Sequence, residues 1–91
     1  MESEKTERGF SIHTFKDKYG VECSLQKSSA ARYDAIWLGC NEPNPRALIN
    51  GEWKNIELPE ETVCNTRMHL TQDQVKELLP ILTRFAETGE V

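Results

Sequence analysis

Residues 62–86 read TVCNTRMHLTQDQVKELLPILTRFA, and the spacing of the apolar residues changes in the middle of this stretch. Up to Thr71 the side chains alternate, as they do in a β-strand that turns one face to a core. The face expected to point to the core comprises Cys64, Thr66, Met68 and Leu70. The opposite face comprises Val63, Asn65, Arg67 and His69. The alternation predicts a strand over residues 62–71 and leaves open whether the second row binds something or is only solvated.

After Thr71 the apolar spacing becomes helical. Thr71 can cap a helix, and Gln74, three residues later, completes a capping box. The apolar residues of one stripe then follow: Val75, Leu78, Leu79, Leu82, Phe85 and Ala86. Gly89 suits the position just beyond the helix end. Pro80 removes one backbone hydrogen bond from this helix, and we expect a kink there and not an end, because the stripe continues past it.

The chain before residue 62 contains further strand-like segments separated by turn residues. Three of these segments are residues 9–15, 21–27 and 35–40. Gly20 can form the turn of a hairpin between the first two. The Asn50-Gly51 pair predicts a second hairpin with a type I′ turn. Strands followed by one amphipathic helix favour an α+β fold: a small antiparallel sheet of four to six strands, with the C-terminal helix packed on one face.

Length and composition indicate a single small domain. The chain has 91 residues, of which 37% are hydrophobic, and a formal net charge of −4. This length supports one modest core. The first eight residues have no apolar periodicity, so we expect residues 1–8 to be a flexible N-terminal tail and residues 9–91 to form the domain. The acidic balance argues against a broad surface for binding a nucleic-acid backbone.

The cysteines and the lack of long apolar runs favour a cytoplasmic protein. Cys23, Cys40 and Cys64 are an odd number at wide spacing, which is more typical of reduced, buried thiols than of a disulfide framework. No apolar run approaches the roughly 20 residues needed to span a bilayer, and no secretory signal pattern opens the chain. We therefore expect a location in the cytoplasm and no contact with a membrane.

If the helix covers the apolar face of the sheet, the other face is left to solvent or to a ligand. Its expected members are Glu22, Ser24, Gln26, Trp37, Asn65, Arg67 and His69. Trp37 does not fit a merely solvated face, because a large aromatic side chain among Arg, His, Asn and Gln is the composition of a binding patch. Packing of Trp37 under the N-terminal tail, the 41–45 loop or the second hairpin is the simpler alternative. Trp53, near the tip of that hairpin, is either an anchor for a partner or packed under the adjacent loop.

Residue types used in catalysis and metal binding are present without the spacing that such sites require. No two of the His and Cys residues lie at zinc-ligand spacing. The serines of the Ser28-Ser29 pair lack a nucleophile elbow, and the glycines are spread singly, so no phosphate-binding loop is formed. We predict a protein that is not an enzyme, has no metal site and needs no cofactor.

Binding is the remaining class of function. The candidate binding residues are Lys27, Ser28, Trp37, Trp53, Asn65, Arg67 and His69. A protein could use an exposed aromatic anchor or an open sheet edge, and that protein could be a second copy of the chain. A nucleotide could place its phosphate on Arg67 or Lys27 and its base on Trp37. A single nucleic-acid strand could stack on Trp37, although the acidic balance weakens this alternative.

Two long motifs carry a resemblance: YGVECSLQKSSAARYDAIWLGC at 19–40 and TRMHLTQDQVKELLPILTRFAETGE at 66–90. They resemble a group of short hypothetical proteins of tailed phages and bacterial prophages, with the pattern YGxxCSLQxSS, then IWLG, then RMHLTxxQVxxLLPxL. The resemblance covers most of residues 15–90 and is weakest at NEPNPRALINGEW, residues 41–53. It brings no established activity, and origin alone does not give function. It implies a binding role, because small phage proteins often block a host enzyme or defence complex, or sequester a nucleotide signal.

Together these observations predict a non-catalytic binding module of phage or prophage type. It would act by protein–protein contact in the cytoplasm of the host cell and modulate or inhibit a host or defence factor. A protein that binds or sequesters a nucleotide is the alternative, and a single-strand nucleic-acid binder is a weaker one. Self-association into a homo-oligomer is compatible with each of these.

Overall fold

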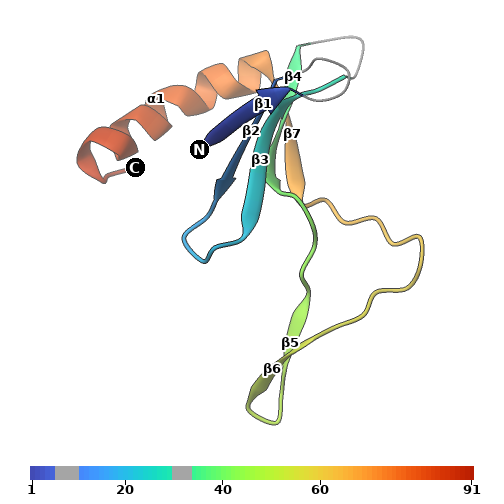
Figure 1. The fold of residues 1–91 in the computed structure, drawn as a ribbon. Coiled ribbons are helices and arrows are strands. Elements are labelled where there is room, and N and C mark those ends of the chain that lie inside the picture. Colours follow the sequence, from blue (N-terminus) through green and yellow to red (C-terminus); the bar gives the residue numbers. More distant parts are fainter. Residues whose placement is uncertain (6–10, 30–33) are drawn as a thin grey trace.

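A computed structural model describes residues 1–5, 11–29 and 34–91. The predicted α+β class is confirmed: the described residues form a five-stranded antiparallel sheet, a separate two-stranded hairpin and one C-terminal helix in contact with the sheet (Figure 1). The strands are β1 (Glu2–Lys5), β2 (Ser11–Lys16), β3 (Glu22–Lys27), β4 (Ala35–Cys40), β5 (Arg46–Ile49), β6 (Glu52–Asn55) and β7 (Arg67–Thr71). The helix is α1 (Gln72–Thr88). No helix in the described part of the chain has the length and apolar character needed to cross a membrane.

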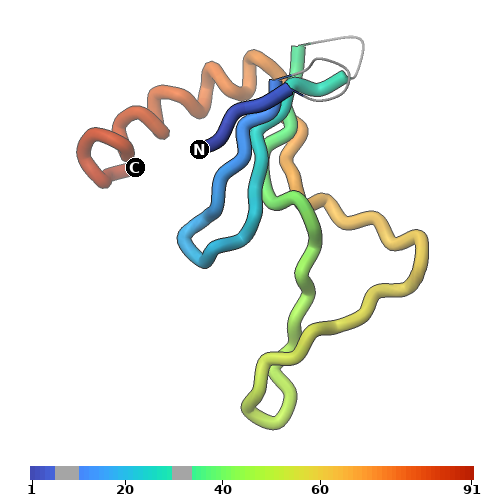
Figure 2. Tube along the Cα trace, in the orientation of Figure 1, coloured from blue at the N-terminus to red at the C-terminus, as the bar shows by residue number. Residues whose placement is uncertain are grey.

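The strands of the sheet follow the order β1-β2-β3-β4-β7, with every neighbouring pair antiparallel. Between β4 and β7 the chain leaves the sheet, forms the β5–β6 hairpin far from it, and returns to pair beside β4 (Figure 2). We call this excursion, residues 41–66, the arm. At the tip of the arm the predicted type I′ turn joins β5 to β6. Asn50 and Gly51 both have positive φ there, at 52° and 80°.

The first residues of the chain form a strand and not the flexible tail predicted for residues 1–8. Glu2–Lys5 form β1, which pairs along its whole length with β2, whereas residues 6–8 lie outside the described residues. Ser3 Oγ and His13 Nδ1 share a hydrogen bond of 2.6 Å across this pair. The strand has no apolar pattern, since backbone hydrogen bonds to the neighbouring strand need none, and for this reason apolar periodicity did not reveal it.

Residues 62–71 also need a correction, because the predicted strand is confirmed only from Arg67 onward. Residues 62–66, including Cys64 and Asn65, lie in no strand. The N–H of Thr66 donates to the carbonyl of Cys64 at 3.0 Å, a contact over two residues that bends the chain away from the sheet. The polar–apolar alternation therefore continues past the point where backbone pairing ends.

The helix begins and ends where the sequence predicts. The Thr71 side chain accepts from the Gln74 N–H at 3.2 Å, and the Gln74 side chain accepts from the Thr71 N–H at 2.9 Å, which completes the capping box. Gly89 takes a left-handed conformation just beyond the helix, and its N–H donates to the carbonyl of Phe85. The helix continues through Pro80, as the apolar stripe predicts.

Little of the chain is buried. Among the described residues, those that are buried are Cys23, Ser24, Ser28 and Ala35. α1 contains no buried residue: its first turn lies beside β7, and the rest extends away from the sheet (Figure 1). Cys64, predicted to face the core, is exposed because the chain has already left the sheet there. The α+β layers are thus present without the closed core that the apolar stripe of α1 leads us to expect.

Candidate functional site

The register of the three strands β3, β4 and β7 places Trp37 in the centre of one face. Gln26 lies opposite Trp37 on one side, and His69 lies opposite it on the other. Because directly paired residues of antiparallel strands share a face, these three side chains project from the same side of the sheet. Ile36 and Leu70, which belong to the other side, line a hollow with Val75 of α1. The Trp37 face is therefore the face away from the helix, as the alternation predicts.

Trp37 and His69 form a parallel stack. Their ring centroids are 3.8 Å apart, and the planes are inclined by only 9°. The guanidinium carbon of Arg67 lies 5.5 Å from the centre of the Trp37 ring, within the range of a cation–π contact. Trp37 is half-buried, while His69 stays exposed. Neighbouring side chains thus cover part of the indole and hold it in a defined position.

Arg67 reaches across β4 to the next strand. Its Nη1 donates to Oε1 of Gln26 on β3 at 3.1 Å, although β4 lies between the two strands. The residue directly opposite Arg67 on β4 is Gly39, which has no side chain to block this path. A Cβ built on Gly39 would lie 2.5 Å from the carbonyl oxygen of Thr66, so this position has no room even for alanine. Gly39 lets β7 approach closely and leaves the surface over β4 open to Arg67.

His69 is held from its other side by a loop residue. His69 Nε2 and Ser28 Oγ share a hydrogen bond of 2.9 Å, and Ser28 is one of the few buried residues. The predicted site residues Ser28, Trp37, Arg67 and His69 are therefore brought together, with Gln26 as an additional member. We call these five residues the Trp37 cluster.

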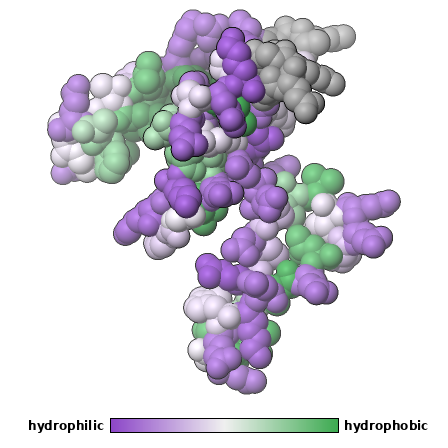
Figure 3. All heavy atoms as spheres, in the orientation of Figure 1, coloured by the Kyte–Doolittle hydropathy of each residue, from purple (hydrophilic) through white to green (hydrophobic). Residues whose placement is uncertain are grey.

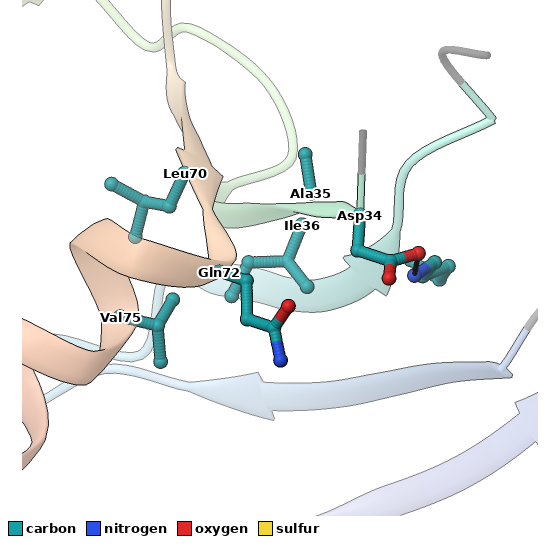
Figure 4. Close-up of a pocket in the computed structure, with 7 residues that line it drawn as sticks. Asp34, Ala35, Ile36, Leu70, Gln72 and Val75 are labelled. Carbon is teal, nitrogen blue, oxygen red and sulfur yellow. Dashed lines mark hydrogen bonds and ion pairs between the residues drawn. The ribbon is translucent and has the colours of Figure 1, made fainter. Parts of the chain in front are cut away.

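Two predicted residues lie apart from the cluster. Lys27 belongs to the opposite face, where its Nζ forms an ion pair of 2.6 Å with Asp34 beside the start of α1 (Figure 4). The hydrogen bond and the positive charge of Lys27 lower the pKa of the Asp34 carboxyl below its usual value. Trp53 lies on β6, in the hairpin of the arm and not in the five-stranded sheet, and 66% of its surface is exposed.

Asn65 lies near the cluster but outside β7. It lines a hollow of about 430 Å³ together with Trp37 and Arg67. The remaining lining residues belong to the two ends of the arm: Asn41, Pro43, Thr62, Val63, Cys64 and Thr66. The hollow therefore lies where the arm leaves the sheet and returns to it, with an aromatic ring and a guanidinium in its wall.

The electrostatics of this place favour an acidic group. Within the described residues, Arg67 forms no ion pair with a carboxylate, and its hydrogen bond goes to the neutral amide of Gln26. A guanidinium has five N–H donors, so most remain for another acceptor. Across the same described ranges, no three His, Cys, Asp or Glu side chains gather as they would around a metal ion. The arrangement can bind a carboxylate or phosphate beside an aromatic surface.

Sequence reasoning placed Gln26 on this face without naming it as a site residue, and it did not identify Gly39. Gln26 lies directly opposite Trp37 once strand pairing is known, and pairing cannot be read from alternation alone. Gly39 carries a weak signal: a glycine inside a strand often marks a close approach of another backbone. That signal indicates the position but not the partner, Arg67.

No protein-family model, curated protein or solved structure matches this chain. The resemblance to short proteins of tailed phages and prophages therefore stays a prediction. Function is inferred from the geometry of the Trp37 cluster and from the open shape of the chain.

Proposed function

We propose that this chain is a non-catalytic binding module that acts by protein–protein contact through the Trp37 cluster. The proposal extends to its setting: the cytoplasm of a bacterial host, where a phage or prophage protein of this kind would modulate a host or defence factor. The observation that carries it is the Trp37–His69 stack with Arg67 beside it, on the face of the sheet away from α1.

The residue types and their rigidity support a protein partner. Trp and Arg are the side chains that most often supply the binding energy of protein interfaces. Here contacts with Gln26 and Ser28 already fix Arg67 and His69, so little side-chain freedom remains to be lost on binding. In an interface centred on this cluster, the partner would meet an aromatic surface beside the guanidinium of Arg67. Among the described residues this guanidinium has no carboxylate partner. An acidic side chain next to an apolar one on the partner fits this surface best.

Quantitative affinity capture tests the proposal. The purified chain is immobilised, exposed to lysate of a bacterial host, and compared with Arg67→Ala and His69→Ala, each first shown by circular dichroism to be folded. Lys16→Ala is the matched control, because it removes one positive charge from an exposed end of the same sheet. We expect at least one protein to be retained by the wild type and the control and reduced more than tenfold by both cluster variants. Equal capture by all four chains would contradict the proposal.

A small anionic ligand is the second candidate function, and the hollow beside Trp37 is the observation that favours it. A nucleotide could place its phosphate on Arg67 and its base in the hollow. Equilibrium dialysis with AMP, ATP and a cyclic dinucleotide tests this candidate directly, with Arg67→Gln as the variant that should lose binding. A single nucleic-acid strand would instead show affinity that falls steeply with added salt.

A further inference from the structure

Large apolar side chains are exposed in two separate parts of the chain. On α1 they form the predicted stripe, with Leu79, Leu82 and Phe85 each more than half exposed. In the arm, Leu48 and Trp53 lie opposite each other on the hairpin and are 59% and 66% exposed. Further exposed apolar residues of these two parts are Ile49, Ile56, Leu58, Val63, Leu78 and Ile81. Figure 3 shows hydrophobic residues, in green, on the surface of α1 and again, apart from these, on the arm.

One chain does not cover these surfaces itself. In the described structure the two strands of the arm pair with each other, and α1 is in contact with β7. The helix extends from one end of the sheet and the arm from the other (Figure 1). Closing either surface within the chain would need the arm to fold back along the whole sheet to reach α1 (Figure 1).

The accessible surface of the chain is larger than that of a compact monomer of the same mass. The accessible surface is 8066 Å², whereas a folded monomer of this mass exposes about 5,400 Å². The excess is roughly 2,700 Å². In permanent dimers each chain buries about 1,000 to 2,500 Å², so the excess is slightly above the upper end of what such an interface removes. The radius of gyration is also large, at 16.2 Å compared with about 12 Å for a compact chain of this length.

We infer that a second copy of this chain covers both surfaces, with the arm of each copy packed against α1 of the other. A chain without a core of its own needs its partner whenever it folds, and a second copy is the one partner present wherever the chain is made. A two-fold axis makes the exchange reciprocal, so each copy gives one arm and receives one. The five residues of the Trp37 cluster belong to neither α1 nor the arm.

The start of α1 offers a place for an anchoring side chain. A hollow of about 270 Å³ lies there between the first turns of the helix and the sheet. Ile36, Leu70 and Val75 provide its apolar wall (Figure 4). Val75 also begins the apolar stripe, so the hollow and the stripe meet at this residue. An arm that follows this surface would place an aromatic residue such as Trp53 in the hollow.

The charges predict how the dimer responds to salt. Both the arm and α1 carry more acidic than basic side chains, so attraction between opposite net charges does not join them. Burial of apolar surface is the driving force, and added salt leaves such burial intact while it screens the repulsion between acidic segments. The dimer should therefore persist, or tighten, when salt is raised.

Mass in solution tests the inference. Multi-angle light scattering on the full chain at about 20 µM should give twice the chain mass of 10.4 kDa at both low and high salt. Leu82→Asp on α1 and Trp53→Ser on the arm should each shift the protein toward the monomer by more than tenfold in dissociation constant. Thr83→Asp is the matched control: it adds the same carboxylate one residue away, outside the stripe, and should leave the dimer unchanged.

Mixing the two variants tests the reciprocal arrangement. A Trp53→Ser copy has an intact helix and a Leu82→Asp copy has an intact arm, so one of the two arm–helix contacts is restored when they meet. The mixture should dimerise more strongly than either variant alone. A monomeric wild type would overturn the inference, as would variants that dimerise as well as the control. If the variants are too unstable to fold, a monomeric wild type still overturns the inference. A monomer that still captures a partner through Arg67 would leave the proposed function standing.

Discussion

At the scale of single residues, the Trp37 cluster shows how a surface row becomes a defined arrangement. Alternation predicted that Trp37, Arg67 and His69 share a face, and strand pairing confirms this. What alternation cannot give is the contact geometry: the parallel stack and the reach of Arg67 to Gln26 depend on register and on Gly39. The pattern therefore predicted that these three residues share a face, whereas their interactions, and the part of Gln26, required the paired strands.

Gly39→Ala should disrupt this site without touching any of its functional groups. The added Cβ would lie 2.5 Å from the Thr66 carbonyl oxygen, and alanine rarely adopts the φ of +146° found here. Backbone strain of this kind costs about 1 to 3 kcal/mol. We expect the midpoint of thermal unfolding to fall and the indole fluorescence of Trp37 to change, as β7 moves from β4. An alanine at Gly20, which also has positive φ but nothing within 4 Å, is the control for conformational strain alone. Equal losses for both would show that the close approach at Gly39 contributes nothing.

The three cysteines should differ in reactivity. Cys23 is buried. This burial raises the pKa of the Cys23 thiol, and the hydrogen bond with Cys40 contributes to the same shift to a smaller extent. Since the thiolate is the reactive form, alkylation of Cys23 near neutral pH should be slow. Cys64 is exposed and should be modified first by iodoacetamide. Peptide mass spectrometry over a time course measures the order, and modification of Cys23 before Cys64 would contradict the burial described here.

At the scale of elements, the helix was predictable almost to the residue because its signals are local. The capping box at Thr71 and the glycine at 89 each act within one turn of the chain. The sheet was predicted less completely: β1 has no apolar pattern, and residues 62–65 continue the alternation of a strand beyond the last backbone hydrogen bond to β4, which the carbonyl of Thr66 accepts. Strand pairing depends on residues far along the sequence, so its extent is the part that local patterns miss.

Thr71→Ala should measure what the capping box contributes. The substitution removes the oxygen that accepts from the Gln74 N–H, and loss of such a cap costs about 1 kcal/mol. Because the last residue of β7 is also the helix cap, we expect α1 to fray at its start while the sheet remains formed. Hydrogen exchange at the first turn of α1 should accelerate, and Thr71→Ser should restore protection. Unchanged exchange at that turn would mean that packing beside β7, not the cap, fixes the helix start.

At the scale of the whole molecule, the sequence predicted a sheet and a helix but not that the apolar face of the helix would stay exposed. An amphipathic stripe shows that a helix has an apolar face to cover, and it does not say which chain covers it. Here the apolar content, 37% of residues, is divided between a helix and an arm that extend in different directions. This division is the reason why the domain buries so little as a single chain. If a second copy covers both surfaces, as we propose, stability becomes a property of the dimer.

Stability that depends on assembly should depend on protein concentration. If folding and dimer formation are coupled, each tenfold rise in concentration adds about 1.4 kcal/mol to the apparent free energy of unfolding per dimer. We expect the urea midpoint to rise steadily between about 1 and 100 µM chain, with the slope of the transition unchanged. Leu82→Asp should lower the midpoint at every concentration, whereas Thr83→Asp should follow the wild type. A midpoint independent of concentration over this range would mean that the open chain is stable alone, and that its exposed stripe and arm are not needed to hold the fold.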